Sequence, residues 1–245
     1  MRNIKLIMAY DGSSYYGFQV QKQGPTIQEV LEKALRELTG ERIRVTPAGR
    51  TDAGVHALGQ VVNFRTESSI PPERFAPALN TCLPRDIRIK LSREVPDDFH
   101  ARYDAIGKVY TYRIYQGPYP SPFLRNYAHF VPKPLDWGKI LEAAAILQGR
   151  HDFKSFQAAG SKVKDTVRTL NRVELARRGP LYQLTFVGDG FLYHQVRNMV
   201  GTLLEVGAGR LQPDDVEGIL KARRRECAGP TAPAAGLFLS RVLYP

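Results

Sequence analysis

The spacing of hydrophobic and polar residues predicts alternating strands and helices in the first part of the chain. Alternate residues are apolar over Ile4–Tyr10, which is the period of a strand with one face more apolar than the other. Residues 27–38 carry apolar side chains at helical spacing, between a capping box that begins at Thr26 and the terminating Gly40. The same criteria predict strands at residues 61–64 and 87–91, and a helix from Pro71-Pro72 to about Asn80.

The rest of the chain repeats this order. It predicts strands at residues 109–115, 167–175, 182–187 and about 237–242, and helices at about 137–148, 193–206 and 213–222. The patterns are interrupted near residue 105, so we expect an α+β protein with mainly antiparallel sheets, divided into residues 1–105 and 106–245. Residues 117–134 are rich in proline and predict a long surface loop, a kind of segment that often carries function.

Composition excludes several classes of protein. Of 245 residues, 43% are hydrophobic and 24% charged, which is typical of a globular chain, and no apolar run approaches the ~20 residues of a membrane span. The N-terminus lacks the residue order of a secretory signal. Cys82 and Cys227 are far apart and the five histidines have no paired spacing, so neither a disulfide framework nor a zinc site is indicated. We therefore expect a cytoplasmic protein with no metal and no membrane contact.

The charge balance indicates a polyanionic partner. The chain has 35 Lys and Arg against 24 Asp and Glu, which gives a formal net charge of +11. A domain this basic carries the electrostatic footprint of a nucleic-acid-binding protein. General solubility is the plain alternative. Since the sequence has no extended basic amphipathic helix, RNA or DNA is favoured over a membrane surface.

Residues Ala48–His56 form the segment best suited to chemistry. Asp52 lies in a short polar turn between Gly49 and Gly54, with the cation of Arg50 two residues before it. Glycine permits backbone conformations and close approaches that a side chain would block, so the two glycines shape a loop around the carboxylate. A single carboxylate beside a cation suits nucleophilic or electrostatic catalysis, in which it stays ionised. A turn in which the aspartate only caps the backbone is the open alternative.

Five segments match one family in the same order along the chain. They are Tyr10–Gln19, Gly49–His56, Asp97–Arg102, Lys108–Tyr112 and Phe191–Asn198, and Gly236–Leu239 closes the series. Together they resemble the tRNA pseudouridine synthase A family, with Phe18 where tryptophan is common. The resemblance extends nearly from end to end, and five ordered matches are far more specific than any single one.

The resemblance implies an enzyme that isomerises uridine to pseudouridine at positions 38, 39 and 40 in the anticodon stem-loop of tRNA. It needs no cofactor, because the uracil is only detached from N1, turned, and rejoined to the same ribose through C5. The implied fold is two ferredoxin-like or RRM-like halves with a shared central cleft. The implied assembly is a homodimer that holds tRNA across both subunits.

The resemblance also assigns residues. It implies that Asp52 is the catalytic carboxylate, that Arg197 pairs with it and keeps it ionised, and that Tyr110 stacks on the uracil. Arg50 would fill the gap left when the target nucleotide flips out, and His56 is placed with it in the substrate-binding set. From the residues alone, Arg197 could equally pack its stem on the core, and Tyr110 could be an ordinary core aromatic.

Further cations are candidates for contacts with RNA phosphates. Arg168 is placed in the substrate-binding set, and the others are Arg172, Lys162, Lys164 and the cluster Arg223–Arg225. For each of them a solvated surface charge is the plain alternative.

Two other classes of protein stay open at this stage. A non-catalytic RNA-binding protein with two RRM-like halves would leave the Asp52 loop without a purpose, and the sequence lacks the aromatic RRM motif. A nucleoside hydrolase would need a second carboxylate near Asp52, for which Asp11 is the candidate.

Overall fold

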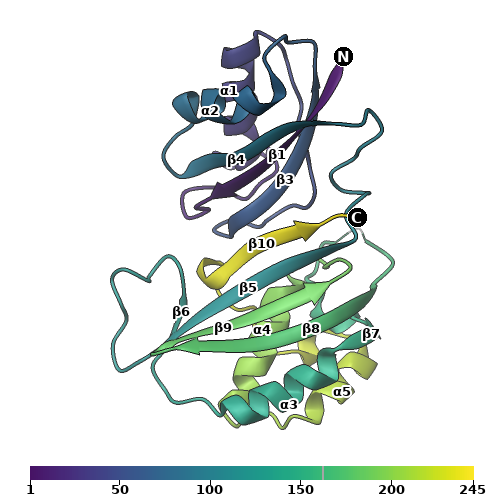
Figure 1. Ribbon diagram of the computed structural model, residues 1–245. Helices are drawn as coiled ribbons and strands as arrows, with labels where there is room; N and C mark the ends of the chain where they lie inside the picture. Colours follow the sequence, from purple (N-terminus) through teal and green to yellow (C-terminus); the bar gives the residue numbers. More distant parts are fainter. Residues whose placement is uncertain (162) are drawn as a thin grey trace. The chain divides into compact units, whose positions relative to one another are not determined.

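The structure is a computed structural model that describes residues 1–161 and 163–245. It contains two compact units, Met1–Ile106 with Phe238–Pro245 and Gly107–Leu237 (Figure 1). The sequence analysis assigned residues 106–245 to one half, whereas the C-terminal segment belongs to the first unit. The reason is that Phe238 and Leu239 pair in parallel with His56 and Ala57, at the start of a strand in that unit. Lys162, a predicted phosphate contact, lies outside the described residues.

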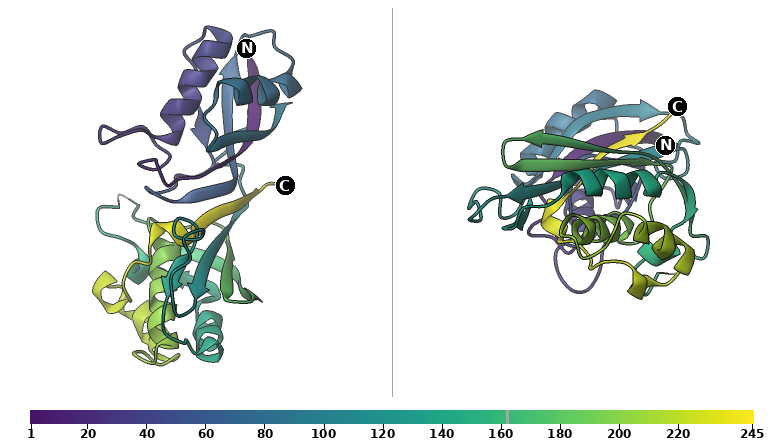
Figure 2. Two further views of the ribbon diagram at one scale, coloured as in Figure 1. Left: turned by 90° about the vertical axis from the view of Figure 1, so that its left-hand side faces the viewer. Right: turned by 90° about the horizontal axis from the view of Figure 1, so that it is seen from below.

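Unit 1 is a sheet with two helices on one face (Figures 1 and 2). Its strands follow the order β4-β1-β3-β10, with β1 antiparallel to both β3 and β4. The core lies between sheet and helices, where Ile4, Leu6 and Met8 of β1 are fully buried. The elements are β1 (Arg2–Tyr10), α1 (Ile27–Thr39), β2 (Thr46–Pro47), β3 (His56–Thr66), α2 (Phe75–Cys82), β4 (Ile87–Val95) and β10 (Leu237–Leu243).

Local sequence explains the bounds of α1. The Thr26 hydroxyl accepts a hydrogen bond from the Glu29 N–H at 3.3 Å, and Gly40 ends the helix with a left-handed φ of 76°. Both features satisfy backbone groups that a helix end leaves unpaired. The helix predicted over residues 27–38 is therefore confirmed, as is the strand-helix-strand-helix-strand order of this unit.

The strands of unit 2 follow the order β5-β9-β8-β7, each antiparallel to its neighbour, with helices on one face (Figures 1 and 2). The strands are β5 (Gly107–Gln116), β6 (His129–Val131), β7 (Gly149–Asp152), β8 (Val167–Arg178) and β9 (Leu181–Gly188). The helices are α3 (Trp137–Leu147), α4 (Gln195–Gly207) and α5 (Asp215–Ala222). The expected α+β class with mainly antiparallel sheets is confirmed. The ferredoxin-like description of each half and the shared cleft stay predictions.

Several element bounds differ from the sequence-based expectation. β3 begins at His56, well before the expected residue 61, because pairing with β10 extends it. α4 begins at Gln195 because His194 has a left-handed φ of 59°, which a helix cannot contain. The short strands β2, β6 and β7 were not predicted, since their few residues show no alternation long enough to detect. In the described part of the chain, no helix is long and apolar enough to cross a membrane.

Candidate active site

The loop that carries Asp52 is anchored to the turn that follows β1. The Phe18 N–H donates to the Thr51 carbonyl at 3.0 Å, and the Gly54 N–H donates to the Tyr15 carbonyl at 3.2 Å. These two hydrogen bonds lie on either side of Asp52, whose side chain is half-buried. Two of the segments singled out in the sequence, residues 10–19 and 49–56, therefore form one structural unit that fixes the position of the carboxylate.

Two glycines allow these segments to approach backbone to backbone. A Cβ on Gly12 would lie 2.1 Å from the Val55 carbonyl oxygen, and one on Gly17 would lie 2.7 Å from the Thr51 carbonyl oxygen. Gly17 also has a φ of +90°, which side chains rarely adopt. Any larger residue at either position must displace the loop.

A buried polar cluster lies beneath the loop. The Tyr10 and Thr51 hydroxyls are 2.7 Å apart, and the Gln60 side-chain amide donates to the Gly49 carbonyl at 2.7 Å. Burial raises the pKa of Tyr10 to about 12, against a smaller lowering by its hydrogen bonds with Thr51 and Gln60. The Tyr10 phenol therefore stays neutral over the physiological pH range, so the charge of the buried cluster does not change there.

His56 is almost fully buried, with 1% of its surface exposed. Its Nδ1 lies 3.1 Å from both the Gly12 N–H and a carboxylate oxygen of Asp11. Nδ1 accepts from Gly12 when the ring is neutral, and the contact with Asp11 is an ion pair when the ring is protonated. The ring also stacks on Phe238 at 4.6 Å. The ring is thus enclosed by protein on the sides that Gly12, Asp11 and Phe238 occupy, and the substrate contact expected from the sequence stays a prediction.

Arg50, unlike the buried His56, lies at the surface. It is exposed, at the start of the Asp52 loop. An exposed guanidinium can form two parallel hydrogen bonds with a phosphate or stack on a base. The position is therefore suited to the contact with RNA that the resemblance implies.

In unit 2, Arg197 lies in the first turn of α4, and hydrogen bonds fix its side chain. Its Nε donates to the Ala232 carbonyl at 2.7 Å, and its Nη1 is 3.3 Å from Nε2 of His194. The Ala232 N–H in turn donates to the Arg197 carbonyl at 3.1 Å. The arginine is half-buried and held at its head, so it differs from an arginine that extends only its stem over the core.

The helix can pack this closely because of Gly201, where a Cβ would lie 1.6 Å from the Pro230 carbonyl oxygen. The residue is thus required for the approach of the segment that contains Ala232. Sequence reasoning missed Gly201 and Ala232, since nothing local shows that residues thirty positions apart meet.

Tyr110 and Tyr112 lie on β5. Tyr110 is 8% exposed, and its ring is edge-on to Phe191 with centroids 5.1 Å apart. Tyr112 is fully buried and donates to the Pro233 carbonyl at 2.8 Å, which identifies it as a core residue. Burial raises the pKa of Tyr112 above the ordinary value. The structure thus brings Tyr110 together with the 191–198 segment that carries Arg197.

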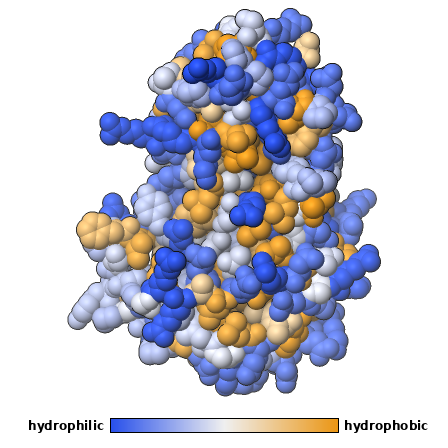
Figure 3. Space-filling model, viewed as in Figure 1, coloured by the Kyte–Doolittle hydropathy of each residue, from blue (hydrophilic) through white to orange (hydrophobic). Residues whose placement is uncertain are grey.

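The other cations have different locations. Arg168 is half-buried and lines a hollow of about 500 Å³ with Arg150, Asp165 and Asp189 among its walls. Arg225 donates to the Asn198 side chain at 3.0 Å, so it belongs to the packing of unit 2. Over the visible face, hydrophilic residues are spread widely, so hydropathy does not mark one RNA-binding patch (Figure 3).

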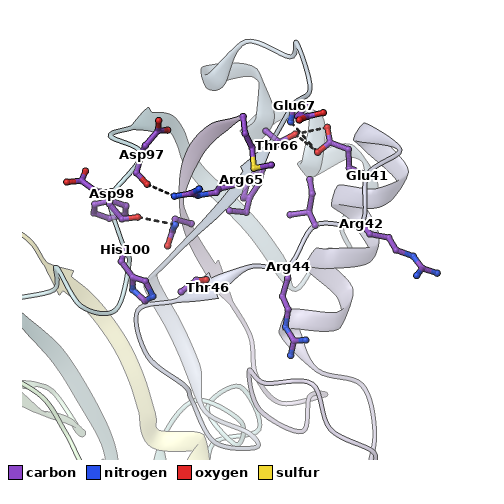
Figure 4. Close-up of a pocket in the computed structure, with 15 residues that line it drawn as sticks. Glu41, Arg42, Arg44, Thr46, Arg65, Thr66, Glu67, Asp97, Asp98 and His100 are labelled. Carbon is purple, nitrogen blue, oxygen red and sulfur yellow. Dashed lines mark hydrogen bonds between the residues drawn. The ribbon is translucent and has the colours of Figure 1, made fainter.

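A second hollow, of about 660 Å³, lies in unit 1 (Figure 4). Arg42 and Arg44 extend from one side of it, and Asp97, Asp98 and His100 line the other side. Among the described residues, no group of His, Cys, Asp and Glu has an arrangement that could hold a metal ion.

Comparison with known proteins gives matches over most of the chain. The family model described as tRNA pseudouridine synthase matches residues 6–104 and 143–245. A protein of Acetivibrio thermocellus named tRNA pseudouridine synthase A is 50% identical over the full length of both chains. A protein of the same name from Moorella thermoacetica is 51% identical over 98% of this chain and 99% of the relative. A solved Cbf5-Nop10-Gar1 complex matches at 14% identity with a TM-score of 0.39, over 82% of this chain and 45% of that chain.

Proposed function

Because the chain belongs to the tRNA pseudouridine synthase family, it is an isomerase that converts uridine to pseudouridine, and we propose that it acts at positions 38, 39 and 40 of the tRNA anticodon stem-loop. The family match and the relatives support tRNA as the substrate. The three positions rest on the resemblance of the five segments.

The reaction rearranges atoms without any net oxidation or reduction. The bond between uracil N1 and ribose C1′ breaks, the base turns, and a bond forms between C5 and C1′. The proton on C5 is lost and N1 gains one. Since the balance needs no second substrate and no electron acceptor, side chains suffice for every step.

Asp52 is the group proposed to act directly on the nucleotide. The observation that carries this assignment is how the Asp52 loop is held, because backbone hydrogen bonds at Thr51 and Gly54, on either side of Asp52, fix the loop against the 10–19 segment. Preorganisation of this kind is what a catalytic group needs, since a displacement of about 1 Å can cost ~100-fold in rate. Whether the carboxylate attacks C6, attacks C1′ or removes a ribose proton is a separate question.

The other proposed roles follow from the resemblance. Arg197 pairs with Asp52 and keeps the carboxylate ionised, and Tyr110 stacks on the uracil. Arg50 occupies the place of the flipped nucleotide, and Arg168 contacts phosphate. His56 holds the end of the Asp52 loop through its buried hydrogen bond with Gly12. We further propose a homodimer that works in the cytoplasm, where tRNA is modified.

Three tRNA transcripts test the proposed positions. Each carries uridine at only one of positions 38, 39 and 40, with cytidine at the other two, and a fourth carries cytidine at all three. Pseudouridine is located by carbodiimide modification and primer extension. We expect product at each single uridine and none in the fourth transcript. Product at a uridine outside the anticodon arm would contradict the proposed positions without affecting the isomerase assignment.

The same reactions separate an isomerase from a nucleoside hydrolase. A hydrolase would release free uracil and leave an abasic ribose, whereas the isomerase retains the base. We expect no free uracil by chromatography.

A further inference from the structure

An exposed aromatic cluster follows β4 in unit 1. The ring of Tyr103 is 75% exposed. The imidazole of His100 lies beside it, with ring centroids 4.2 Å apart and an interplanar angle of 33°, and the Arg102 guanidinium is 5.8 Å from its centroid. A single exposed ring is ordinary on a protein surface, but here the ring has an imidazole and a guanidinium beside it. We call residues His100–Asp104 the Tyr103 turn.

The Tyr103 turn is held rigidly by its own hydrogen bonds. Nδ1 of His100 accepts from the backbone N–H groups of Arg102 and Tyr103, at 3.1 and 3.3 Å. The His100 N–H donates to the Asp104 carboxylate at 2.9 Å, and the Asp104 N–H donates to the His100 carbonyl at 3.1 Å. The backbone that carries the tyrosine is therefore ordered, and little backbone entropy is lost when a partner binds.

The surroundings favour RNA as that partner. His100 also lines the 660 Å³ hollow of unit 1, and Arg42 and Arg44 extend from its opposite side (Figure 4). Both arginines are exposed. Asp97 and Asp98 lie on the His100 side, so a phosphate group would be accepted only on the arginine side. The Tyr103 ring can stack on a base and the Arg102 guanidinium beside it can bind a phosphate, which matches a nucleotide, whose base is apolar on its faces and whose phosphate is charged.

From these contacts we propose that the Tyr103 turn is an RNA-binding site in addition to the Asp52 loop, and that it stacks an unpaired nucleobase of tRNA on Tyr103. This proposal rests on the proposed function, because it takes tRNA as the substrate. Arg102 contacts a phosphate near the stacked base. A net charge of +11 supports a polyanion such as RNA as the partner.

The test measures tRNA affinity and its salt dependence for Tyr103→Ala, Tyr103→Phe and Arg102→Gln. Tyr119→Ala is the matched control, because Tyr119 is 78% exposed but has no aromatic or cationic neighbour among the described ring contacts. Loss of a stacked base weakens binding by about tenfold, and stacking carries no charge. We therefore expect Tyr103→Ala to raise Kd about tenfold with an unchanged salt slope, and Tyr103→Phe to restore the affinity.

Arg102→Gln should change the salt dependence of tRNA binding. It should lower the slope of log K against log salt by about one, because one phosphate contact is lost. Turnover at saturating tRNA should stay at the wild-type level for the control Tyr119→Ala. A fully paired RNA duplex of the same length should bind Tyr103→Ala and wild type equally, since it offers no unpaired base.

Three results would overturn the proposal. The first is a Kd for Tyr103→Ala within twofold of wild type. The second is an equal loss of affinity in Tyr119→Ala, which would mean that any exposed tyrosine has this effect. The third is a change of sedimentation coefficient in Tyr103→Ala, which would mean that the ring contacts a second copy of the chain. These are binding measurements on folded variants with matched melting temperatures. Their result does not depend on which uridine of the tRNA is modified.

Discussion

The Asp52 loop of unit 1 and the first turn of α4 in unit 2 hold their charged side chains in different ways. Asp52 is in a loop, and its position depends on backbone hydrogen bonds and on glycines that permit close approach. Arg197 is in a helix, and its guanidinium is bound by the Ala232 carbonyl and by His194. The short Asp52 side chain is positioned by the backbone of its loop. The long Arg197 side chain is positioned by the groups that its guanidinium contacts.

This difference determines which substitutions each site tolerates. Near Asp52, changes in backbone shape should matter most, even where no side-chain contact is lost. Near Arg197, changes in the head group should matter most, while the helix keeps its position. The predictions below begin with the largest expected effect.

Substitution of Asp52 itself should have the largest effect. Asp52→Asn keeps the shape of the side chain but removes the negative charge that its proposed role requires. We expect turnover to fall by more than about 10³-fold, as for other residues that act directly on substrate. Affinity for tRNA should stay within about threefold, because phosphate contacts supply most of it. Loss of binding in parallel with turnover would point to a structural role for the carboxylate.

Removal of the Arg197 head group should rank second. Arg197→Ala should lower turnover by about 10²- to 10³-fold, the range seen when one preorganised charged contact is removed. It should also cost about 1–3 kcal/mol of stability, because the Ala232 carbonyl loses its donor. Arg197→Lys is the control: it keeps the charge but lacks the planar fork, so it should recover only part of the activity. Full recovery would mean that charge alone suffices.

Glycine substitutions test the backbone argument for the Asp52 loop. Gly12→Ala and Gly17→Ala should each lower turnover at least ~10-fold, because the new methyl group displaces the loop by a fraction of an ångström or more. Gly40→Ala is the matched control, since Gly40 has a φ of +76° with nothing within 4 Å of the added Cβ. It should cost about 1–2 kcal/mol of stability and leave turnover unchanged. Equal losses of turnover in all three would show that the effect is general destabilisation.

The buried cluster beneath the loop should give the smallest effect, visible only at high pH. The pKa of Tyr10 is about 12 in the folded chain against 10.0 in its ordinary state, so the unfolded chain loses its proton first as pH rises. Stability should fall between pH 10 and 12, by at most about 1.4 kcal/mol per pH unit from this group. Tyr10→Phe should show a shallower fall than wild type in denaturant unfolding across that window, and the same slope below it.

The sequence predicted individual helices and strands better than the long-range pairings between them. The helix at residues 27–38 was predictable because its capping residues and apolar stripe are local, and Asp52 stood out because glycines flank it. The contact of β10 with β3 was not predictable, because nothing near Phe238 indicates a partner at His56. For the same reason the burial of His56 against Phe238 was not predictable from the sequence.

The central claim is that Asp52 and Arg197 act as one unit on the same uridine. The most direct test is tritium release from tRNA labelled at uridine C5, measured in single turnover for wild type, Asp52→Asn, Arg197→Ala and the double variant. Formation of the C5 glycosidic bond expels that hydrogen, so release reports the isomerisation itself. If the two residues act together, the double variant should be no slower than Asp52→Asn alone. A rate loss equal to the product of the two single losses would contradict the account.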